Sequence, residues 1–453
     1  MANWVQTFLA SNPDLAAKPI ASRGQRHIAH DNGDGTRTWN FTGAPIHYHD
    51  GTEWKPIDTK LIYYPDTDEY GAAGLKTRIK SDGSARIIDE KIATVHAQKS
   101  VEVGTYNQAT GVFTIQKTLP AGTVVDDSIV RTVGNFTHKL TLTETGLREH
   151  LVLNSALAVS VPNNIWLVIK TELASVQLFP DGWLGDTTIK GYQFPKPHGW
   201  DGNNKELPLK RYARFADGKQ YVYTGILGSS LTGVTYPVTI DPDYLDSTND
   251  GQIYGSNVTY SIARTTSEGF NSSQNESAIG QCLNGGFYSN MRLSLKFDTS
   301  GIPDADTVTQ VNLKLVCNGD YSTAQDFDVQ IVKQDWSAQD PLSDVNREVA
   351  YDACLAGTLD DNIWRNTLDM AINTQYSSGN LNTAWVSKTG STYYSLRSSR
   401  DYAGNIPTGF NEIIYIVLQE HATVAYRPIL TVVSSGGGSV IPVFMANYRQ
   451  QRS

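Results

Sequence analysis

Short runs in which apolar and polar residues alternate, each ended by Gly, Asn, Asp or Pro, constrain this fold most. Residues 292–316 (RLSLKFDTSGIPDADTVTQVNLKLV) contain two such runs around a turn-rich segment. Side chains alternate between the two faces of a β-strand, so a period of two predicts strands with one buried face. We therefore expect two neighbouring strands joined by an Ile-Pro turn, whose core-facing residues are Leu293, Leu295, Phe297, Val311, Leu313 and Leu315.

The same pattern recurs along most of the chain. Residues 26–41 and 45–64 each read as two strands around an Asp/Asn/Gly turn, which is a hairpin signal. Regularly spaced turns favour an antiparallel sandwich or barrel over βαβ units. The sequence thus predicts an all-β protein with two main antiparallel β-sandwich or jelly-roll regions, a short N-terminal helical arm and an extended C-terminal tail. The clearest later strands are expected at 292–298, 309–316, 326–333, 411–419 and 427–433.

Turn-rich boundaries suggest the division into domains. Residues 4–17 are expected to form a helix with Trp4, Val5, Phe8 and Leu9 on one face. Two further helical stretches are expected at 344–357 and 360–373, capping an open end of a sandwich. We expect an arm at 1–22, an N-terminal β domain at 23–245 (a split into two lobes near 120 stays open), a jelly roll at 246–433, and a Gly linker with a docking peptide at 434–453.

Charge and cysteine content exclude several classes of protein. The 453-residue chain carries a net charge of −9 and no long basic block, which argues against nucleic-acid binding. The N-terminus lacks a basic region before an apolar run, and no run of about 20 apolar residues occurs, so neither a signal peptide nor membrane insertion is expected. The spacing of Cys282, Cys317 and Cys354 fits no zinc pattern, and buried free thiols are expected.

The C-terminal half resembles the DNRLRE-type β-sandwich domain, which is close to carbohydrate-binding jelly rolls. The similarity rests on Arg292 entering a strand, then LKFD at 295–298, Ile302-Pro303 with an acidic turn, VNLKL at 311–315 and YRPILTVV at 426–433. It implies a jelly roll in this half, with Arg292 and Asp298 in structural pairing rather than in catalysis.

The N-terminal half resembles the β region that precedes such domains in bacterial surface and polymorphic-toxin-like proteins. The matching pieces are APIHYHDGTEWKPIDTKL at 44–61, GLREHLVLN at 146–154 and YPVTIDP at 236–242. The usual secretion signal of that family is absent, which puts a cell-wall protein in doubt. A chain of this kind with an N-terminal arm and a C-terminal peptide looks like a tailed-phage virion component.

Several polar clusters contain residue types that bind metals, but plainer interpretations are favoured for each of them. His47 and His49 would face one side of a strand, near His27 and His30, yet a solvated hairpin face explains them better. DNGDGT at 31–36 places Gly33 where an EF-hand needs an oxygen ligand, so a hairpin turn is favoured. DSTNDG at 246–251 is oxygen-rich, but linker chemistry is favoured over calcium. No metal site and no cofactor are predicted.

Candidate functional residues fall into two groups. No catalytic motif is legible, so no catalytic residue is predicted and the protein is expected not to be an enzyme. Two polar-aromatic loops, 185–204 and 391–405, suggest a glycan platform, because glycan recognition uses aromatic faces with polar neighbours. Core or interface packing is an equally good account of any one of these rings. The candidate glycan-binding residues are Tyr192, Trp200, Tyr393, Tyr394 and Tyr402.

The tail beyond the SSGGGS linker gives the second group. Its apolar side chains would be costly to leave in water, so docking into a partner is expected, with a disordered end as the alternative. The candidate docking residues are Ile441, Val443, Phe444, Met445, Tyr448 and Arg449.

Three functions follow from these observations. The first is a non-enzymatic structural component of a tailed-phage virion (a capsid decoration, neck or tail-appendage protein), homo-oligomeric and bound to other virion proteins through its N-terminal arm and C-terminal tail. The second is a glycan-binding adhesin on a phage or bacterial surface. The third is a polysaccharide-cleaving tail appendage, whose carboxylates would have to converge from distant strands.

Overall fold

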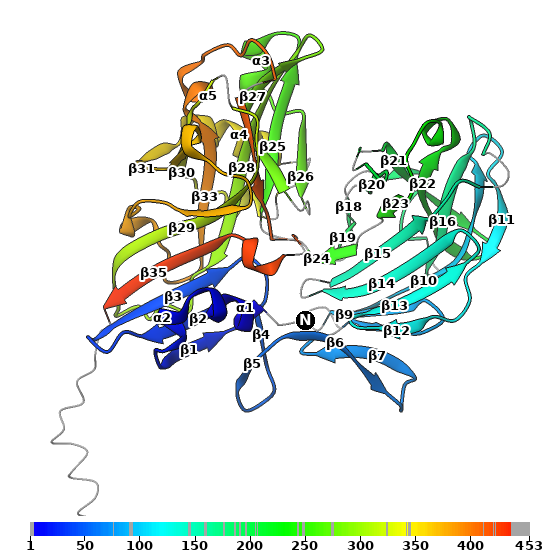
Figure 1. Cartoon of the computed structure of the whole chain (residues 1–453), viewed down its shortest axis with the longest axis horizontal. Helices are drawn as coiled ribbons and strands as arrows, with labels where there is room; N and C mark the ends of the chain where they lie inside the picture. The colour runs from blue at the N-terminus through cyan, green and yellow to red at the C-terminus, as the bar shows by residue number, and fades with distance from the viewer. Residues whose placement is uncertain are drawn as a thin grey trace, which may run out of the picture. The chain divides into compact units, whose positions relative to one another are not determined.

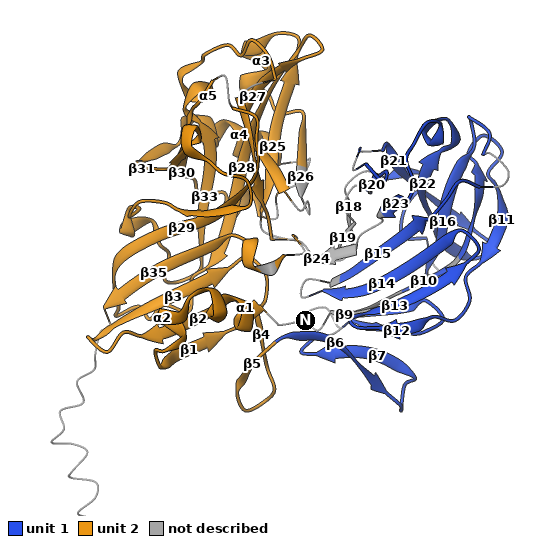
Figure 2. Cartoon of the chain, in the orientation of Figure 1, with its two compact units in different colours: residues 1, 57–247 blue, residues 2–56, 248–453 orange. Residues whose placement is uncertain are grey.

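In the computed structural model the chain forms two compact units (Figure 2). Unit 1 comprises residues 57–247, and unit 2 comprises residues 2–56 together with 248–453. The structure describes residues 4–435, apart from 76, 90–93, 144–145, 158–160, 175–176, 185–186, 190–191, 195–196, 204, 206, 242–243, 247–249, 273–275, 323–324, 341, 343–345, 411, 420 and 422.

Unit 1 is a sandwich of two antiparallel sheets (Figure 1). The first sheet, in spatial order, consists of β17 (Gly182–Leu184), β21 (Leu209–Ala216), β22 (Lys219–Leu227), β16 (Trp166–Ala174), β10 (Thr94–Asn107), β9 (Ser84–Asp89), β8 (Arg78–Ile79), β7 (Glu69–Ala73) and β6 (Asp58–Tyr64), with β11 (Val112–Thr118) beside β10. The second consists of β12 (Thr123–Val125), β13 (Ser128–Val133), β14 (Phe136–Thr143), β15 (Gly146–Leu153), β24 (Tyr244–Asp246), β19 (Tyr192–Phe194) and β18 (Thr187–Ile189), with β23 (Val238–Asp241) on β15 and β20 (His198–Trp200) on β23.

The core of unit 1 lies between these two sheets. Val103 and Ile169 of the first sheet share a fully buried cluster with Leu151 of the second. Strand β14 shows the alternation most clearly, because every second residue from Phe136 onward is buried. This shared core makes residues 57–247 one compact unit, and the structure shows no division near residue 120.

Unit 2 is built on one continuous antiparallel sheet that wraps around its own core (Figure 1). In spatial order its strands are β1 (Ile20–Gly24), β2 (His27–Asp31), β3 (Thr36–Thr42), β35 (Ile429–Ser435), β29 (Thr307–Asp320), β34 (Glu412–Val417), β27 (Glu276–Asn284), β28 (Phe287–Asp298), β33 (Ser391–Ser398), β30 (Asp328–Lys333) and β31 (Thr358–Asn366). Strands β25 (Asp250–Asn257), β26 (Gly269–Ser272) and β32 (Thr374–Ser377) pair off this path, and β4 (His47–His49) pairs with β5 (Trp54–Pro56) separately.

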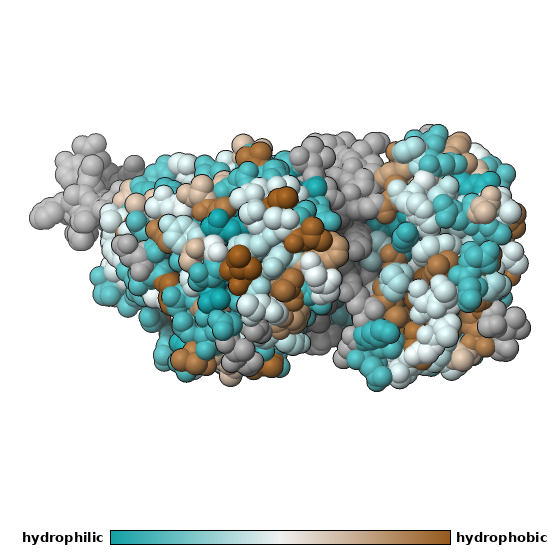
Figure 3. Space-filling view, turned by 90° about the horizontal axis from the view of Figure 1, so that it is seen from above, coloured by the Kyte–Doolittle hydropathy of each residue, from teal (hydrophilic) through white to brown (hydrophobic). Residues whose placement is uncertain are grey.

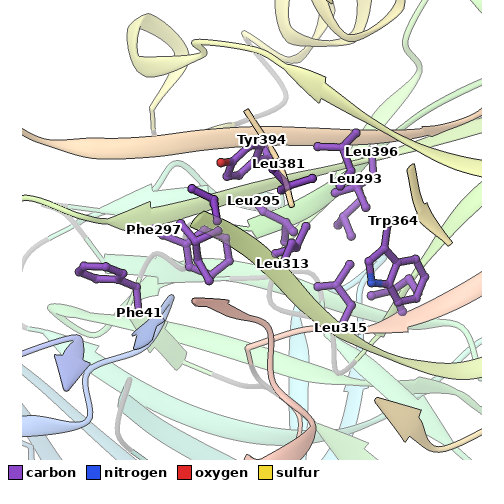
Figure 4. Close-up of a cluster of buried hydrophobic side chains, with 14 of the residues drawn as sticks. Phe41, Leu293, Leu295, Phe297, Leu313, Leu315, Trp364, Leu381, Tyr394 and Leu396 are labelled. Atoms are coloured by element: carbon purple, nitrogen blue, oxygen red, sulfur yellow. The ribbon is translucent and has the colours of Figure 1, made fainter. Parts of the chain in front are cut away.

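The N-terminal segment is part of the C-terminal sandwich. Strand β3 pairs with β35 over its whole length, from Thr36 opposite Ser435 to Thr42 opposite Ile429. Phe41 lies in the same buried cluster as Phe297 (Figure 4). Residues 23–56 therefore differ from the expected division, which placed them in the N-terminal β domain. The local sequence of residues 23–56 does not show that they belong to unit 2, because the strand that pairs with β3 lies at the other end of the sequence.

The helices are short and peripheral. The expected helix at 4–17 forms as two pieces, α1 (Trp4–Ser11) and α2 (Pro13–Ala16), broken before Pro13. Trp4, Val5 and Phe8 are buried in one cluster with Ile28, Ile46 and Ile429 of unit 2, so this face of the arm is used within the chain. The others are α3 (Tyr260–Thr265), α4 (Arg347–Ala356), α5 (Ser399–Ala403) and the 3-10 turns η1 (Gly228–Leu231), η2 (Ser337–Gln339), η3 (Thr367–Asp369), η4 (Thr383–Trp385) and η5 (Val424–Tyr426).

The all-β fold class and the strands expected in 292–435 are confirmed. The six residues predicted to face the core between 292 and 316 are at most 1% exposed. Their strands are not hydrogen-bonded neighbours as expected, because β34 and β27 lie between β29 and β28. Helix α4 falls within the expected 344–357. The helix expected at 360–373 is wrong, because 358–366 is strand β31, which pairs with β30 and buries Trp364 in the main core.

Cys282, Cys317 and Cys354 are buried free thiols, and burial raises the pKa of each to about 11. No helix in the described residues combines the length and apolar character that a membrane span needs. On the face that Figure 3 shows, hydrophobic residues occur in small groups among hydrophilic ones.

Candidate functional site

The rings predicted to bind glycan are dispersed. The side chain of Tyr192 lies outside the described residues. Trp200 is half-buried on β20 in unit 1, 6.3 Å from the His150 ring and nearly perpendicular to it. Residues 187–189, 192–194 and 198–200 form short strands paired within unit 1, so the expected loop at 185–204 is in large part sheet.

The other three predicted rings belong to unit 2 and contact different neighbours. Tyr393 packs edge-on against Trp336, with ring centroids 4.7 Å apart, and donates to Asp340 at 3.2 Å. Tyr402 is 49% exposed and lies under the guanidinium of Arg397. Tyr394 is fully buried in the main core, so its selection as a glycan contact is wrong. Strand alternation explains the error, because Tyr394 and its neighbour Tyr393 face opposite ways.

The remaining predicted sites divide between buried and undescribed residues. His47 is 1% exposed and its Nδ1 lies 3.0 Å from the carbonyl oxygen of Gly24, so it is not on a solvated hairpin face. Among the described residues no group of three His, Cys, Asp or Glu side chains is arranged to hold a metal. The docking residues Ile441, Val443, Phe444, Met445, Tyr448 and Arg449 lie outside the described residues, and so do residues 247–249 of the turn at 246–251.

A concentration of aromatic rings that the sequence reasoning missed lies on the first sheet of unit 1. The inner face of this sheet carries Val103, Leu167 and Ile226 into the core. Residues of opposite parity on the same strands face away from that core. This second face, called here the aromatic face, carries Tyr106, Phe113, Trp166, Trp183, Tyr212, Tyr221 and Tyr223.

Strand register brings these rings together. Directly opposite residues share a face, so Tyr106 lies beside Phe113 on one side and Trp166 on the other. A second row runs from Tyr223 through Tyr212 to Trp183. The rings thus come from six strands: β10, β11, β16, β21, β22 and the edge strand β17. All members of the cluster they form in the described chain come from this one sheet.

The rings pack in two tiers. Tyr106 and Tyr223 stack at 4.4 Å with planes 9° apart, and they are only 1% and 5% exposed. Trp183 is 39% exposed and lies 5.0 Å from the Trp166 ring and 5.2 Å from Tyr212. The buried pair supports the outer rings, and Trp183 offers its surface to solvent.

Gly104 gives the rings room. A Cβ at this position would meet Phe113 Cζ at 2.8 Å and the carbonyl oxygen of Thr114 at 2.3 Å. A larger residue would therefore collide both with the neighbouring strand and with the Phe113 ring. The absence of a side chain lets that ring settle against the sheet.

Lysines and carboxylates border the aromatic face. The Lys170 ammonium lies 4.5 Å from the Tyr221 ring centre and 3.1 Å from Glu102. The Lys210 ammonium lies 5.1 Å from the Trp183 ring centre. Such cation–π contacts hold the lysine side chains over the rings and place the charged Lys210 ammonium over the exposed indole.

A cavity of about 230 Å³ opens beside the aromatic face, within unit 1. Glu172 lines it and lies opposite Tyr221 across the β16–β22 pairing, so cavity and aromatic face adjoin. Four basic side chains and two acidic ones contribute to its wall. The lining residues are Glu69, Arg78, Lys80, Ser84, Ala85, Arg86, Gln98, Lys99, Glu172 and Leu173.

Ion pairs fix part of this wall. Arg86 donates to both carboxylate oxygens of Glu69, at 2.7 and 2.6 Å, and these bonds hold the pKa of Glu69 below its ordinary value. Lys99 pairs with Asp82 at 2.6 Å. The geometry suits the binding of a small polar group, whereas the aromatic face suits a flat, partly apolar ligand.

Arg131, His138 and Glu149 form a buried hydrogen-bonded group in unit 1. Arg131 donates from Nε and Nη2 to Nδ1 of His138, which leaves the proton on Nε2 to donate to Glu149 at 2.5 Å. Burial lowers the pKa of His138, and the bond to His138 holds the pKa of Glu149 low. His138 and Glu149 are fully buried, so they stiffen the sandwich and are inaccessible to a ligand.

Comparison with known proteins identifies no family for this chain. No family model matches the sequence, and no curated protein matches it. Two solved structures with weak similarity are those of the Gx and Gt strains of infectious bursal disease virus, both 10% identical to this chain. The Gx match covers 92% of this chain and 78% of that one at a TM-score of 0.14; the Gt match covers 76% of each at 0.10. Scores this low carry no argument about fold or function.

Proposed function

We propose that this chain is a non-enzymatic carbohydrate-binding protein whose glycan lies on the aromatic face of unit 1. The supporting observation is Trp183, a 39% exposed indole that packs edge-on against Tyr212 and has the Lys210 ammonium over its ring. The apolar faces of sugar rings pack on aromatic rings, and sugar hydroxyls bond to charged neighbours. This proposal corresponds to the adhesin function that the sequence suggests, with different residues as the platform.

The rigidity of the platform favours this use. The rings sit on regular strands rather than on loops, and the Tyr106–Tyr223 stack holds them in place before a ligand arrives. A preorganised aromatic surface loses little conformational freedom on binding. This small entropic cost matters for a sugar, because removing the water bound to each sugar hydroxyl also costs free energy.

The test is affinity electrophoresis of the full chain through gels that contain neutral or acidic polysaccharides. Trp183→Ala is expected to weaken binding about tenfold, the effect of losing roughly 1.4 kcal/mol of stacking and buried area. Phe287→Ala is the matched control, since Phe287 is 53% exposed in unit 2. Near-ultraviolet circular dichroism should show both variants folded. Equal binding by Trp183→Ala and the unaltered chain would exclude the aromatic face as the glycan-binding site.

A second proposal concerns where the protein acts: we propose that it is a structural component of a tailed-phage virion. It rests on the resemblance of the sequence to tailed-phage virion components, and the pairing of β3 with β35 ties the two ends of the described chain into one sheet. A domain whose two ends are paired in one sheet holds its remaining surfaces in a fixed arrangement. Purified phage particles from the source should then contain the chain in a fixed ratio to the major capsid protein by quantitative mass spectrometry. Particles that lack it would overturn this proposal without affecting glycan binding.

A further inference from the structure

We propose that the cavity beside the aromatic face binds the anionic group of an acidic glycan, a carboxylate or a sulfate ester. This inference rests on the proposed glycan-binding function and names the class of sugar that the site selects. The cavity volume of about 230 Å³ far exceeds what one water needs and leaves room for such a group.

The charges of the cavity favour an anion. The lining has four cations, Arg78, Lys80, Arg86 and Lys99, and two acids, Glu69 and Glu172. Arg86 pairs with Glu69, Lys99 with Asp82, and Glu172 with Lys219. With Asp82 and Lys219 included there are five cations and three acids, so a charge of +2 remains, on Arg78 and Lys80.

The hydrogen bonds of Arg78 do not neutralise its charge. Its Nη1 donates to the backbone carbonyl oxygens of Leu75 and Thr77, at 2.5 and 3.0 Å, and its guanidinium lies 4.6 Å from the Tyr64 ring centre. These contacts orient the guanidinium without cancelling its charge. An arginine held in this way is well suited to bond a carboxylate or sulfate oxygen.

The preference for an anion is confined to the cavity. The whole chain has a net charge of −9, so a polyanion is not drawn to it by its overall field. Lys99, Glu172 and Tyr221 follow one another across β10, β16 and β22 in register. One sugar of a chain lying on the aromatic face is thereby able to present its acidic substituent to the cavity while its neighbours stack on the rings.

The experiment uses the full chain on an array of neutral, carboxylated and sulfated glycans, followed by titration of the strongest binder. Acidic glycans are expected to dominate, and the carboxylated and sulfated arms show which anion fits. Lys80→Glu should weaken acidic-glycan binding at least tenfold. Lys139→Glu is the matched control, because Lys139 is half-buried on the second sheet of unit 1.

The outcomes separate this inference from the proposed function. Neutral glycans bound as tightly as acidic ones would overturn the inference and leave the proposed function standing. Acidic binding that Trp183→Ala abolishes but Lys80→Glu leaves intact would also overturn the inference. Failure of every glycan to bind would overturn both.

Discussion

Arg292 and Asp401 form a two-bond ion pair in the interior of unit 2. Arg292 Nε donates to Asp401 Oδ2 at 2.8 Å and Nη2 donates to Oδ1 at 3.1 Å, with both side chains 1% exposed. The pair joins strand β28 to helix α5. Arg292 also donates to the carbonyl oxygens of Tyr351 and Arg264, which lie on α4 and α3. One guanidinium thus joins four elements, which confirms structural pairing for Arg292.

Removing one partner of this pair should strongly destabilise unit 2. Arg292→Met removes the buried partner of Asp401 and leaves it only Arg264, which is 24% exposed and whose Nε lies 3.5 Å from Asp401 Oδ1. The loss should cost about 3 kcal/mol and lower Tm by roughly 10 °C for a unit of this size. Scanning calorimetry of the full chain measures the shift. Lys55→Met is the control, since Lys55 pairs with Asp50 at 2.6 Å but is 46% exposed. A shift no larger than that of Lys55→Met would contradict the structural role of Arg292.

Trp39 tests whether the N-terminal segment belongs to unit 2. It is 1% exposed in the main core, and its Nε1 donates to Ser434 Oγ at 3.0 Å. Trp39→Ala should cost about 3–5 kcal/mol, because it opens a cavity and leaves a buried hydroxyl without its donor. The calorimetric transition that moves should be the one that Arg292→Met moves. Movement of the other transition alone would assign residues 2–56 to unit 1.

The sequence predicts local elements well in this chain because half-buried strands leave a period-two signal. The alternation in 292–316 locates both strands and all six core residues. Partners distant in sequence leave no such signal. Trp39 and Ser434 are 395 positions apart, and nothing in either local pattern shows that their strands adjoin. The helix predicted at 360–373 fails over 360–366, because the local pattern does not show the pairing with β30 that holds Trp364 in the core.

The aromatic face was missed for the same physical reason. Its rings come one or two at a time from YVYTG at 221–225, RYARF at 211–215 and single residues elsewhere. Each ring in isolation reads as core. Only the register of β10, β16, β21 and β22 shows that they share the face opposite the core. Alternation within YVYTG would have placed Tyr221 and Tyr223 on one face, but not beside Trp166 or Trp183.

The stability of unit 2 should fall in mild acid because of His47. Burial lowers the pKa of His47 to about 4 in the folded chain, from 6.5. The unfolded state therefore binds the proton first. The contribution of His47 is complete above pH 6.5 and is lost as the pH falls toward 4, about 3 kcal/mol in all.

Urea unfolding of unit 2 at pH 7.5 and 5.0 measures this effect. The midpoint should fall less in His47→Gln than in the unaltered chain, by the equivalent of about 2 kcal/mol. His49→Gln is the control, as it lies on the same hairpin but is exposed. Burial also lowers the pKa of His27 and His30, so some acid sensitivity should persist in His47→Gln. The same pH dependence in both variants would show that His47 is not the titrating group.

Tyr394 distinguishes core packing from ligand binding. Its ring is fully buried, and its hydroxyl has no hydrogen-bond partner among the described residues. Burial also raises its pKa. Tyr394→Phe removes a desolvated hydroxyl and keeps the ring, so unit 2 should be unchanged or more stable by up to about 1 kcal/mol. Tyr394→Ala should instead cost about 3–5 kcal/mol through the cavity it leaves. Loss of glycan binding in a fully folded Tyr394→Phe would return this residue to the binding site.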